Sequence, residues 1–409
     1  MSASPARAPR LETPAFFPAT RETALARWEV FLPHAGRTYQ ETRNHDHGPD
    51  RRSNTSVLSP FVAHRLITEQ ELVTEAIARH GEGGAYKFAS EVYWRTYFKG
   101  WLEARPSVWT RYQGQVARDL DHLEGGGRKA YEDAVAGRTG IDCFDAWAEE
   151  LVSTGWLHNH ARMWFASIWI FTLGLPWSLG ADFFYRHLLC GDPASNTLSW
   201  RWVAGLHTKG KAYKATAYNI ARYTDGRFDP GDALSGSAVP LEDDWNGAAS
   251  PPPVGDTPER SVPTLLVLHE DDLRPESIPQ LSGLDIVGVV GIQCTAGRSP
   301  LPAEELPLAF TGEAVSDGLR RAGEAFGTDT RVLEGDEAIA SAAGDFGAEQ
   351  VVTPYAPVGP VADRLAAEHR DGLSLVRVQR DYDRAAWPHC AKGFFAVRKQ
   401  IPGLVQAYA

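Results

Sequence analysis

The sequence has few of the residues that usually hold metals or disulfides. It contains four cysteines among 409 residues, Cys143, Cys190, Cys294 and Cys390, and no two of them form a C-x-x-C pair. This scatter matches neither the common zinc and iron–sulfur arrangements nor a disulfide framework. We therefore expect no metal site, and we interpret each cysteine first as a buried thiol.

The sequence also lacks a long apolar run. The longest, at 164–177, is too short and too interrupted to span a bilayer. The first residues, MSASPARAPRLETPAFF, have no apolar core of a signal peptide. Neither G-x-G-x-x-G nor G-x-x-x-x-G-K occurs, so there is no dinucleotide or P-loop signature. We expect a cytoplasmic protein that does not contact membranes.

Positive charge is scarce overall but unevenly placed. The net charge is −11, which disfavours nucleic acid as a partner. Residues 1–230 nevertheless sum to +2, so residues 231–409 carry −13. The first part can offer a basic face to phosphates, and the second part cannot easily do so.

Helical spacing of apolar residues dominates the first part, which contains most of the thirteen tryptophans. We predict a flexible tail at 1–20 and an all-helical domain at 21–230, because no period-two alternation occurs before residue 230. An aromatic-rich helix is expected at 87–102. Residues 111–140 are polar, and Gly125, Gly126 and Gly127 are interpreted as a loop.

The second part begins after a linker rich in Pro, Gly, Ser and acid at 231–262. Short apolar runs with β-branched residues then predict strands, and amphipathic segments between and after them predict helices. The expected strands are 264–269, 285–292, 349–355 and 373–379, and the expected helices are 314–326, 337–346 and 361–369. This alternation predicts a doubly wound, Rossmann-like α/β domain at 263–405.

Residues 154–228 mix aromatic and polar side chains in a way that packing alone does not explain. Asn159, Arg162, Asp192 and Asn196 lie among many tryptophans and phenylalanines. Buried polar groups cost free energy unless they are paired. A large ligand that is both flat and polar would satisfy this set.

Four segments carry a family resemblance. TGWLHNHARM resembles a TGWxHNRxRM run, GDPASNTLSWRW resembles GDxAxNxxxWQW, NTSVLSP resembles TSxLSP, and EVYWRTYF resembles ELxWREFY. Taken in their order along the chain, these segments resemble the flavin-binding core of the DNA photolyase/cryptochrome family, over roughly residues 21–230. PTLLVLHEDDLRPES also resembles that family's opening strand, yet it begins at Pro263. The resemblance therefore implies a circular permutation, in which the α/β domain follows the helical domain and 231–262 is the new connection.

The resemblance implies FAD as the cofactor. The residues that would hold its phosphates and sugar are Tyr39, Thr55, Ser56, Val57, Leu58 and Ser59. Arg162, Asp192 and Asn196 would lie at the flavin ring. Without the resemblance, Ser59 and Pro60 would be interpreted as a plain helix start. Family members often carry an antenna chromophore as well, which this sequence does not identify.

One position departs from the family. Cys190 stands where an acid usually pairs with the arginine matched by Arg162. We expect a neutral thiol to be unable to form this pair. Arg162 would then need another counter-charge, or the reduced flavin itself.

The resemblance also places a substrate pocket and an electron path. Glu91, Trp94, Asn159, Met163 and Trp202 match the positions that surround a flipped pyrimidine dimer. Trp200 and Trp177 match the two inner members of a three-tryptophan relay, whose outer position falls near residue 124 without a tryptophan; Trp109, Trp147 and Trp169 are candidates to replace it. Taken singly, the pocket tryptophans and Met163 would be interpreted as helical core.

A basic loop follows Trp202. The residues interpreted as DNA contacts are Arg95, Lys209, Lys211 and Lys214, with His207, Arg201 and Arg222 nearby. A solvated charged loop is an equally good interpretation of the lysines taken alone. The lysine cluster predicts strongly salt-dependent binding to DNA phosphates.

Together these implications predict a deoxyribodipyrimidine photo-lyase. Such an enzyme repairs cyclobutane pyrimidine dimers in UV-damaged DNA with blue light, by electron transfer from excited reduced FAD to a flipped-out dimer. The alternative is a cryptochrome-type blue-light photoreceptor without repair activity. We expect a monomer.

Overall fold

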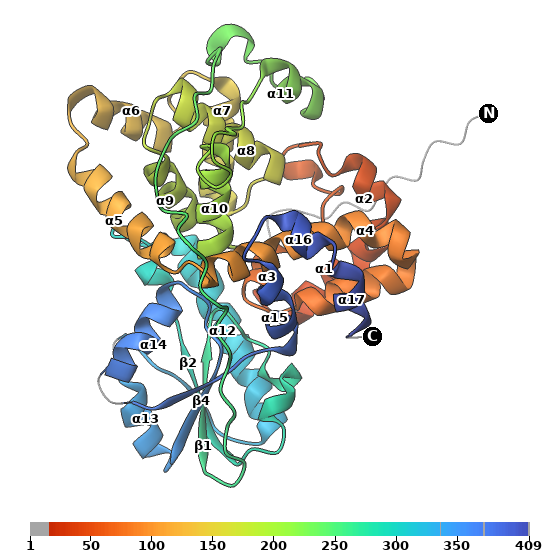
Figure 1. Ribbon diagram of the computed structural model, residues 1–409, viewed down its shortest axis with the longest axis vertical. Helices are drawn as coiled ribbons and strands as arrows, with labels where there is room; N and C mark the ends of the chain where they lie inside the picture. The colour runs from red at the N-terminus through yellow and green to blue at the C-terminus, as the bar shows by residue number, and fades with distance from the viewer. Residues whose placement is uncertain (1–15, 336, 371–372, 408–409) are drawn as a thin grey trace.

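The computed structural model describes residues 16–335, 337–370 and 373–407, so most of the predicted tail at 1–20 lies outside the described residues. The described chain forms a helical part and an α/β part that pack against each other (Figure 1). Among the described residues, none of the helices is both long enough and apolar enough to cross a membrane.

The helical part contains helices and no strand within residues 16–262, as the sequence predicts. Its α-helices are α1 (Arg21–Phe31), α2 (Arg37–Thr42), α3 (Ser59–Ala63), α4 (Glu69–Glu103), α5 (Ser107–Asp121), α6 (Gly125–Val135), α7 (Asp142–Thr154), α8 (Asn159–Ser167), α9 (Trp177–His187), α10 (Pro193–Val203) and α11 (Ala217–Tyr223). A π-helical turn, Ile168–Thr172, continues α8.

Helix α4 is the longest element; it belongs to the helical part and also contacts the α/β part. It starts with a capping box, in which Thr68 and Glu71 satisfy each other's backbone N–H groups. Gly81 interrupts it with φ 70° and ψ 163°, a conformation that glycine adopts without a steric penalty. Beyond this break the helix carries the aromatic run predicted for 87–102.

The predicted loop at Gly125, Gly126 and Gly127 was wrong. Residues 111–140 lie largely in α5 and α6, and Gly125, Gly126 and Gly127 open α6 instead of lying in a loop. Glycine is a poor former of helix interiors, but the first turn tolerates it because its N–H groups have no intrahelical partners. Buried residues of α5, such as Trp109 and Tyr112, supply the packing that propensity does not.

The α/β part is built on one parallel sheet. Its strands are β1 (Thr264–His269), β2 (Ile286–Ile292), β3 (Thr330–Val332), β4 (Gln350–Pro354) and β5 (Leu375–Val378), in the spatial order β3-β2-β1-β4-β5. All four neighbouring pairs are parallel. The helices that follow strands are α12 (Glu305–Phe326), α13 (Ile339–Asp345) and α14 (Pro360–Arg370).

Side chains of the central strand β1 alternate between the two faces of the sheet, and different helices pack on each face. Leu265 and Val267 of β1 pack with the core residues of α13 and α14. Leu266 and Leu268 point the other way, into a core shared with α12 and with α1 and α3 of the helical part. Since side chains alternate between faces with period two, one strand joins the two parts of the molecule into a continuous core.

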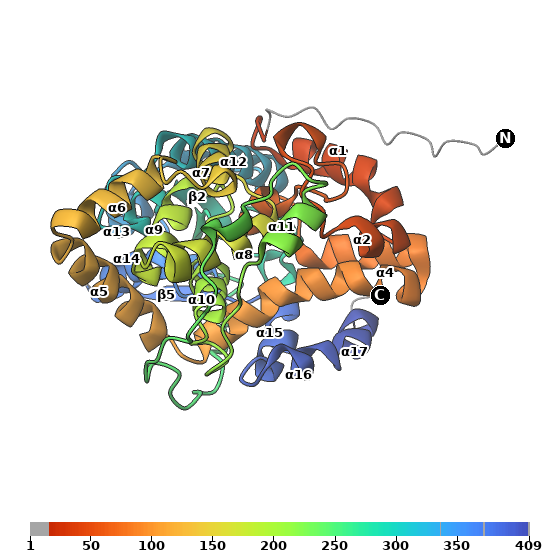
Figure 2. The same ribbon diagram turned by 90° about the horizontal axis from the view of Figure 1, so that it is seen from above.

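The chain ends on the helical part. After β5, helices α15 (Asp381–Ala386), α16 (Phe394–Arg398) and α17 (Ile401–Gln406) all pack against α4. Figure 2 shows these blue helices alongside the orange α4. The predicted α/β unit at 263–405 thus includes a segment, 381–406, that leaves the sheet.

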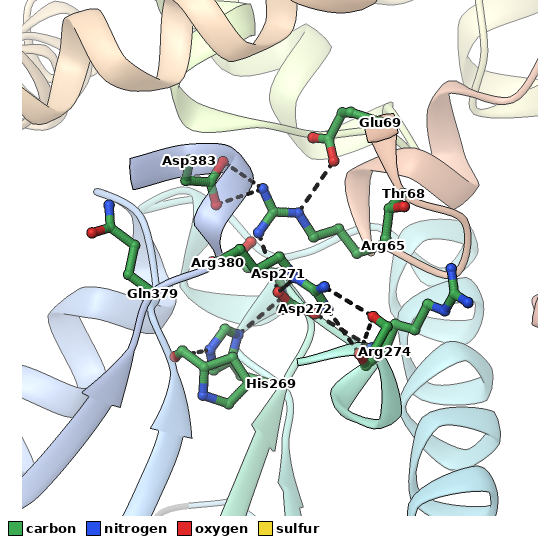
Figure 3. A network of polar contacts seen from close by, with 12 residues as sticks. Arg65, Thr68, Glu69, His269, Asp271, Asp272, Arg274, Gln379, Arg380 and Asp383 are labelled. Carbon is green, nitrogen blue, oxygen red and sulfur yellow. Dashed lines mark hydrogen bonds and ion pairs between the residues drawn. The ribbon is translucent and has the colours of Figure 1, made fainter. Parts of the chain in front are cut away.

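A buried network of ion pairs links the two parts (Figure 3). Arg65 pairs with Glu69 at 3.3 Å, with Asp272 after β1 at 3.1 Å and with Asp383 of α15 at 2.7 Å. Arg380 also pairs with Asp272, at 2.5 Å. Arg65 adopts φ 50°, a conformation that non-glycine residues rarely take and that its three carboxylate partners hold in place.

The end of α4 makes a second polar contact with the α/β part. Glu103 accepts hydrogen bonds from the Val358 backbone N–H at 2.6 Å and from the Tyr355 hydroxyl at 2.8 Å. Burial raises the pKa of the Glu103 carboxyl to about 7, and these two hydrogen bonds limit the rise. The carboxyl is therefore partly protonated near neutral pH.

Candidate flavin and substrate site

The turn that precedes α3 is the first component of the candidate site. Val57 adopts φ 52°, and a β-branched residue in this region is strained. The Thr55 hydroxyl is buried and has no hydrogen-bond partner among the described residues. A strained turn with an unsatisfied polar group favours a ligand at this place.

Arg52 adds charge to the same turn. It is 5% exposed, lies over the Trp156 ring with 4.5 Å from guanidinium carbon to ring centroid, and pairs with Glu150 through Nη2. Its Nε and Nη1 atoms are buried and have no partner in the described part of the chain. Free guanidinium donors fit a phosphate well, because the fork geometry matches phosphate oxygens. Sequence reasoning missed Arg52, although the arginine pair at 51–52 stands just before the matched turn.

The other residues predicted for the phosphate and sugar side have mixed surroundings. Ser56 accepts a 3.4 Å hydrogen bond from the Leu58 N–H, and Ser59 accepts one of 3.0 Å from the Trp156 indole. Tyr39 is half-buried, with its ring edge-on to Phe88 at 5.4 Å between centroids. Burial raises the pKa of the Tyr39 hydroxyl, which therefore acts only as a neutral hydrogen-bonding group.

Asp192, predicted to lie at the flavin ring, is buried and fully paired. It caps α10 by accepting from the Ser195 N–H at 2.6 Å. It also pairs with Lys99 at 2.9 Å and with Arg95 at 3.2 Å. Burial opposes its ionisation, but the two cations outweigh burial and hold the pKa of Asp192 well below its usual range. Lys99 was not predicted; its position one helical turn after Arg95 was the available signal.

The Asp192 cluster continues into the interdomain network. Arg95 pairs with Glu69 at 3.1 Å, and Glu69 is also a partner of Arg65. A chain of alternating charges thus runs from the ring side of the site to the α/β part. The charge of Arg95 is used inside the protein, which does not favour the predicted contact of Arg95 with DNA.

Arg162 and Cys190 lie together in the structure. Arg162 Nη2 lies 3.4 Å from Cys190 Sγ, and Arg162 Nε donates to the Leu157 carbonyl at 2.8 Å. Burial opposes ionisation of Cys190, yet Arg162 and a hydrogen bond with Ser59 lower the pKa of the thiol below its ordinary value. The Cys190 sulfur is therefore a side-chain contact of the Arg162 guanidinium.

Asn196 lies on α10, one turn after its start. Its side-chain amide donates to the Ala181 carbonyl of α9 at 2.8 Å, and this bond fixes how the amide is turned. The residue is 8% exposed. Asp192 and Asn196 therefore present fixed polar groups from one helix, which suits a rigid ring with polar edges.

The five predicted substrate residues come from three helices, one of which contacts the other two. Helix α10 packs against both α4 and α8. Glu91 and Trp94 lie on α4, Asn159 and Met163 on α8, and Trp202 on α10. All five retain solvent exposure: Asn159 is exposed, and the other four are half-buried. The structure thus brings them to one helical junction as partly accessible side chains, which does not favour the purely core interpretation.

Two of these residues have close neighbours that sequence did not predict. The Trp94 ring stacks on Phe394 of α16, with centroids 3.8 Å apart and planes at 12°. Glu91 pairs with Lys87 at 2.7 Å and with Arg43 at 3.3 Å. One face of Trp94 is therefore covered by the C-terminal segment.

The predicted relay tryptophans are buried in the same region. Trp200 of α10 is 2% exposed, and Trp177 at the start of α9 is 8% exposed. Trp109, Trp147 and Trp169, the candidates for the outer position, are each at most 2% exposed. None of the three reaches the surface, so none is suited to the outer end of a relay.

The basic loop differs from its prediction in part. Lys209, Lys211 and Lys214 are exposed, and Lys214 also bonds the Gly236 carbonyl. Arg201, in contrast, is 0% exposed and paired with Asp243, so it is not a surface contact. His207 Nε2 shares a hydrogen bond of 3.0 Å with the Tyr97 hydroxyl. Burial, aided by the charge of Arg201, lowers the pKa of the His207 imidazole to about 4 and keeps the ring neutral.

Comparison with known proteins agrees with this geometry. Residues 88–236 match the family described as the FAD binding domain of DNA photolyase. The chain is 36% identical over 158 residues to a deoxyribodipyrimidine photo-lyase of Streptomyces griseus, covering 38% of this chain and 33% of the relative. It is 29% identical over 206 residues to that of Escherichia coli, covering 49% of this chain and 42% of the relative.

A cryptochrome DASH of Ostreococcus tauri is 30% identical over 220 residues, covering 52% of this chain and 38% of the relative. A class III photolyase structure from Agrobacterium tumefaciens is similar with 26% identity and a TM-score of 0.42, covering 52% of this chain and 44% of that one. The chain matches less than half the length of each of these proteins. Residues 88–236 thus resemble the FAD-binding domains of the DNA photolyase family, and FAD is the cofactor that fits the unsatisfied donors of the turn at 52–59 and the fixed polar groups of α10.

Proposed function

We propose that this protein repairs cyclobutane pyrimidine dimers in DNA with light. The observation that carries the proposal is the junction of α4, α8 and α10, where Glu91, Trp94, Asn159, Met163 and Trp202 remain partly exposed beside the FAD-binding residues. FAD in its reduced, light-excited form would supply the electron that opens the dimer.

The chain's own residues would bind and orient the lesion. Trp94 and Trp202 offer flat faces to the two bases, and base–aromatic stacking contributes roughly 1–3 kcal/mol per base. Glu91 and Asn159 can hydrogen-bond the base edges, and Met163 fills an adaptable apolar gap. A damaged base pair leaves the duplex at the lowest cost, which favours the lesion over intact DNA.

Lys209, Lys211 and Lys214 would contact the phosphates beside the lesion. They are exposed on the loop that follows Trp202, so they lie next to the proposed opening. Each phosphate neutralised by a lysine makes binding steeper in salt, by about 0.9 in the slope of log affinity against log salt.

We also infer that the α/β part is the photolyase α/β domain in permuted order. The support is the parallel sheet with order β3-β2-β1-β4-β5, an order found in Rossmann-like folds. The loop after β1, which carries Asp272 and Arg274, contacts the helical part directly: Asp272 pairs with Arg65, and Arg274 with Glu71.

The decisive experiment illuminates the FAD-loaded, reduced protein with dimer-containing DNA. We expect dimers to disappear in light and to persist in the dark. Trp94→Ala and Glu91→Ala should slow repair while flavin stays bound; Lys209→Gln with Lys211→Gln should flatten the salt dependence of DNA binding, whereas Lys129→Gln on α6 should not. Dimers that persist under light in the native protein would contradict the proposal.

A second function is favoured by one observation, the Phe394 ring on Trp94. If that face is permanently covered, light absorption would serve signalling, as in a cryptochrome-type photoreceptor. Phe394→Ala separates the two. Equal repair by the native protein and this variant supports the enzyme, and repair only after the substitution supports the photoreceptor.

A further inference from the structure

We propose that Trp245, a residue of the linker 231–262, is the outer member of an electron relay that runs inward through Trp177 and Trp200. The inference rests on the proposed flavin photochemistry but not on DNA repair. The linker runs along the helical part before it enters β1, as the green segment in Figure 1 shows. It thereby brings a tryptophan next to Trp177, whereas the matched outer position near residue 124 has none.

The inner step joins two adjacent helices. Trp200 packs so closely on Gly180 of α9 that a Cβ atom there would lie 2.3 Å from the Trp200 ring. Trp177 stands three residues before Gly180 on the same helix, so both lie on one face. The Trp200 ring is thus one helical turn from Trp177.

The outer step crosses from α9 to the linker. The Trp177 and Trp245 ring centroids are 5.8 Å apart, with planes at 62°. Exposure rises along the path, from 2% for Trp200 to 8% for Trp177, and Trp245 is half-buried. An oxidised indole at Trp245 can therefore meet water and external reductants, which Trp200 and Trp177 cannot.

The charges around the outer step are balanced by the same linker segment. The guanidinium carbon of Arg201 lies 4.8 Å from the Trp245 ring centroid and 5.7 Å from that of Trp177. This cation alone would disfavour a positive radical on either ring. Asp243 binds Arg201 through both oxygens, at 2.5 and 3.1 Å, and also accepts a hydrogen bond from the Trp245 backbone N–H at 3.2 Å. Residues 243–245 thus deliver the ring and the charge that offsets Arg201.

Electrons move inward along the relay, from Trp245 to the flavin. Trp200 gives one electron to light-excited, oxidised FAD; Trp177 refills Trp200, and Trp245 refills Trp177. Trp245 is left as a radical cation and releases its indole N–H proton to water. An external thiol then restores one electron and one proton to Trp245, and the thiol is oxidised.

A competing exit leads away from the linker. Tyr112 also contacts Trp177, with centroids 5.8 Å apart, and Trp109 contacts Tyr112 at 5.5 Å. Both are buried, at 1% and 2% exposure, and the Trp109 indole donates to Asp363 at 3.1 Å. Because neither ring reaches the surface, an external thiol cannot reach a radical on this route, so Trp109 provides a matched control.

The test is photoreduction of the FAD-loaded, oxidised protein under blue light with dithiothreitol and without DNA. We expect Trp245→Phe to slow the loss of the oxidised flavin absorbance by roughly tenfold, and Trp109→Phe to leave it near native. Transient absorption should show a long-lived deprotonated tryptophan radical, quenched by thiol, in the native protein and not in Trp245→Phe. Asp243→Asn keeps the ring and should slow photoreduction through the uncompensated Arg201.

Native photoreduction in Trp245→Phe, or slowing in Trp109→Phe instead, would overturn the proposal. Thermal unfolding of the variants without FAD confirms that the linker stays folded. Chemically reduced Trp245→Phe should match the native protein in any dimer repair. If neither repairs dimers while Trp245→Phe photoreduces slowly, the repair function fails and the relay stands.

Discussion

The turn at 52–59 and the network around Arg65 are two buried polar clusters with one backbone feature in common. Each contains a non-glycine residue at positive φ, Val57 in the first and Arg65 in the second. Their pairing is opposite: Arg65 has three carboxylate partners, whereas Arg52 and Thr55 retain polar atoms without partners in the described chain. A strained backbone whose polar side chains are all paired indicates a structural link between the helical part and the α/β part. A strained backbone beside polar atoms without partners indicates a ligand site.

The largest effect should come from breaking the paired cluster. Arg65→Met would leave Glu69, Asp272 and Asp383 in the interior without their shared cation. Loss of one partner from a buried ion network costs about 3–5 kcal/mol. We expect the free energy of unfolding, measured by urea denaturation, to fall by that order. Arg320→Ala, which removes a surface cation 59% exposed beside Asp317, is the control and should cost well under 1 kcal/mol.

An effect of about 3 kcal/mol at most is expected from pH at Glu103. The folded protein holds this proton up to about pH 7, while the ordinary pKa is 4.5. The folded state therefore binds more protons than the unfolded state between these values, and stability falls as pH rises through this window. Glu103→Gln should remove this part of the fall in denaturation measured at pH 5, 6, 7 and 8. The same pH slope in the variant would show that Glu103 titrates normally.

The smallest and sharpest comparison uses two threonines. Thr96 bonds the Tyr382 hydroxyl at 2.8 Å between α4 and α15, whereas the buried Thr55 hydroxyl is without a partner. Thr96→Val should cost about 1–2 kcal/mol of stability and leave FAD affinity unchanged. Thr55→Val should leave the stability of the FAD-free protein within about 0.5 kcal/mol and weaken FAD roughly tenfold. Calorimetry and flavin titration check both, and a stability loss in Thr55→Val would contradict a ligand role.

Local sequence pattern was sufficient for most of the fold. The predicted strand 264–269 coincides with β1, because six consecutive buried residues are a strong signal. β3 was missed, since three largely exposed residues, Thr330–Val332, carry no apolar run. The termination of the sheet at β5 and the return of 381–406 to α4 were not visible either, because nothing in a local pattern says which surface a helix covers.

Sequence predicted the residues of the candidate site that belong to the matched motifs, but not several of the neighbours that contact them. Cys190 was recognised from sequence as the unusual position beside Arg162, but only the structure gives the distance between the two side chains. Lys99 and Arg52 were missed because a buried cation has the same sequence signature as a surface one. Phe394 on Trp94 and Trp245 on Trp177 join residues far apart in the chain, and only tertiary structure reveals such pairs.

The return of α15, α16 and α17 to α4 has a consequence for synthesis on the ribosome. Helix α4 emerges within the first quarter of the chain, but the residues that cover Trp94, Tyr93 and Thr96 are among the last to be translated. Domains generally fold as they emerge, N-terminal first. Here the first domain made must wait for the last helices before its surface is complete, so premature termination near residue 380 would expose an aromatic face to chaperones and proteases.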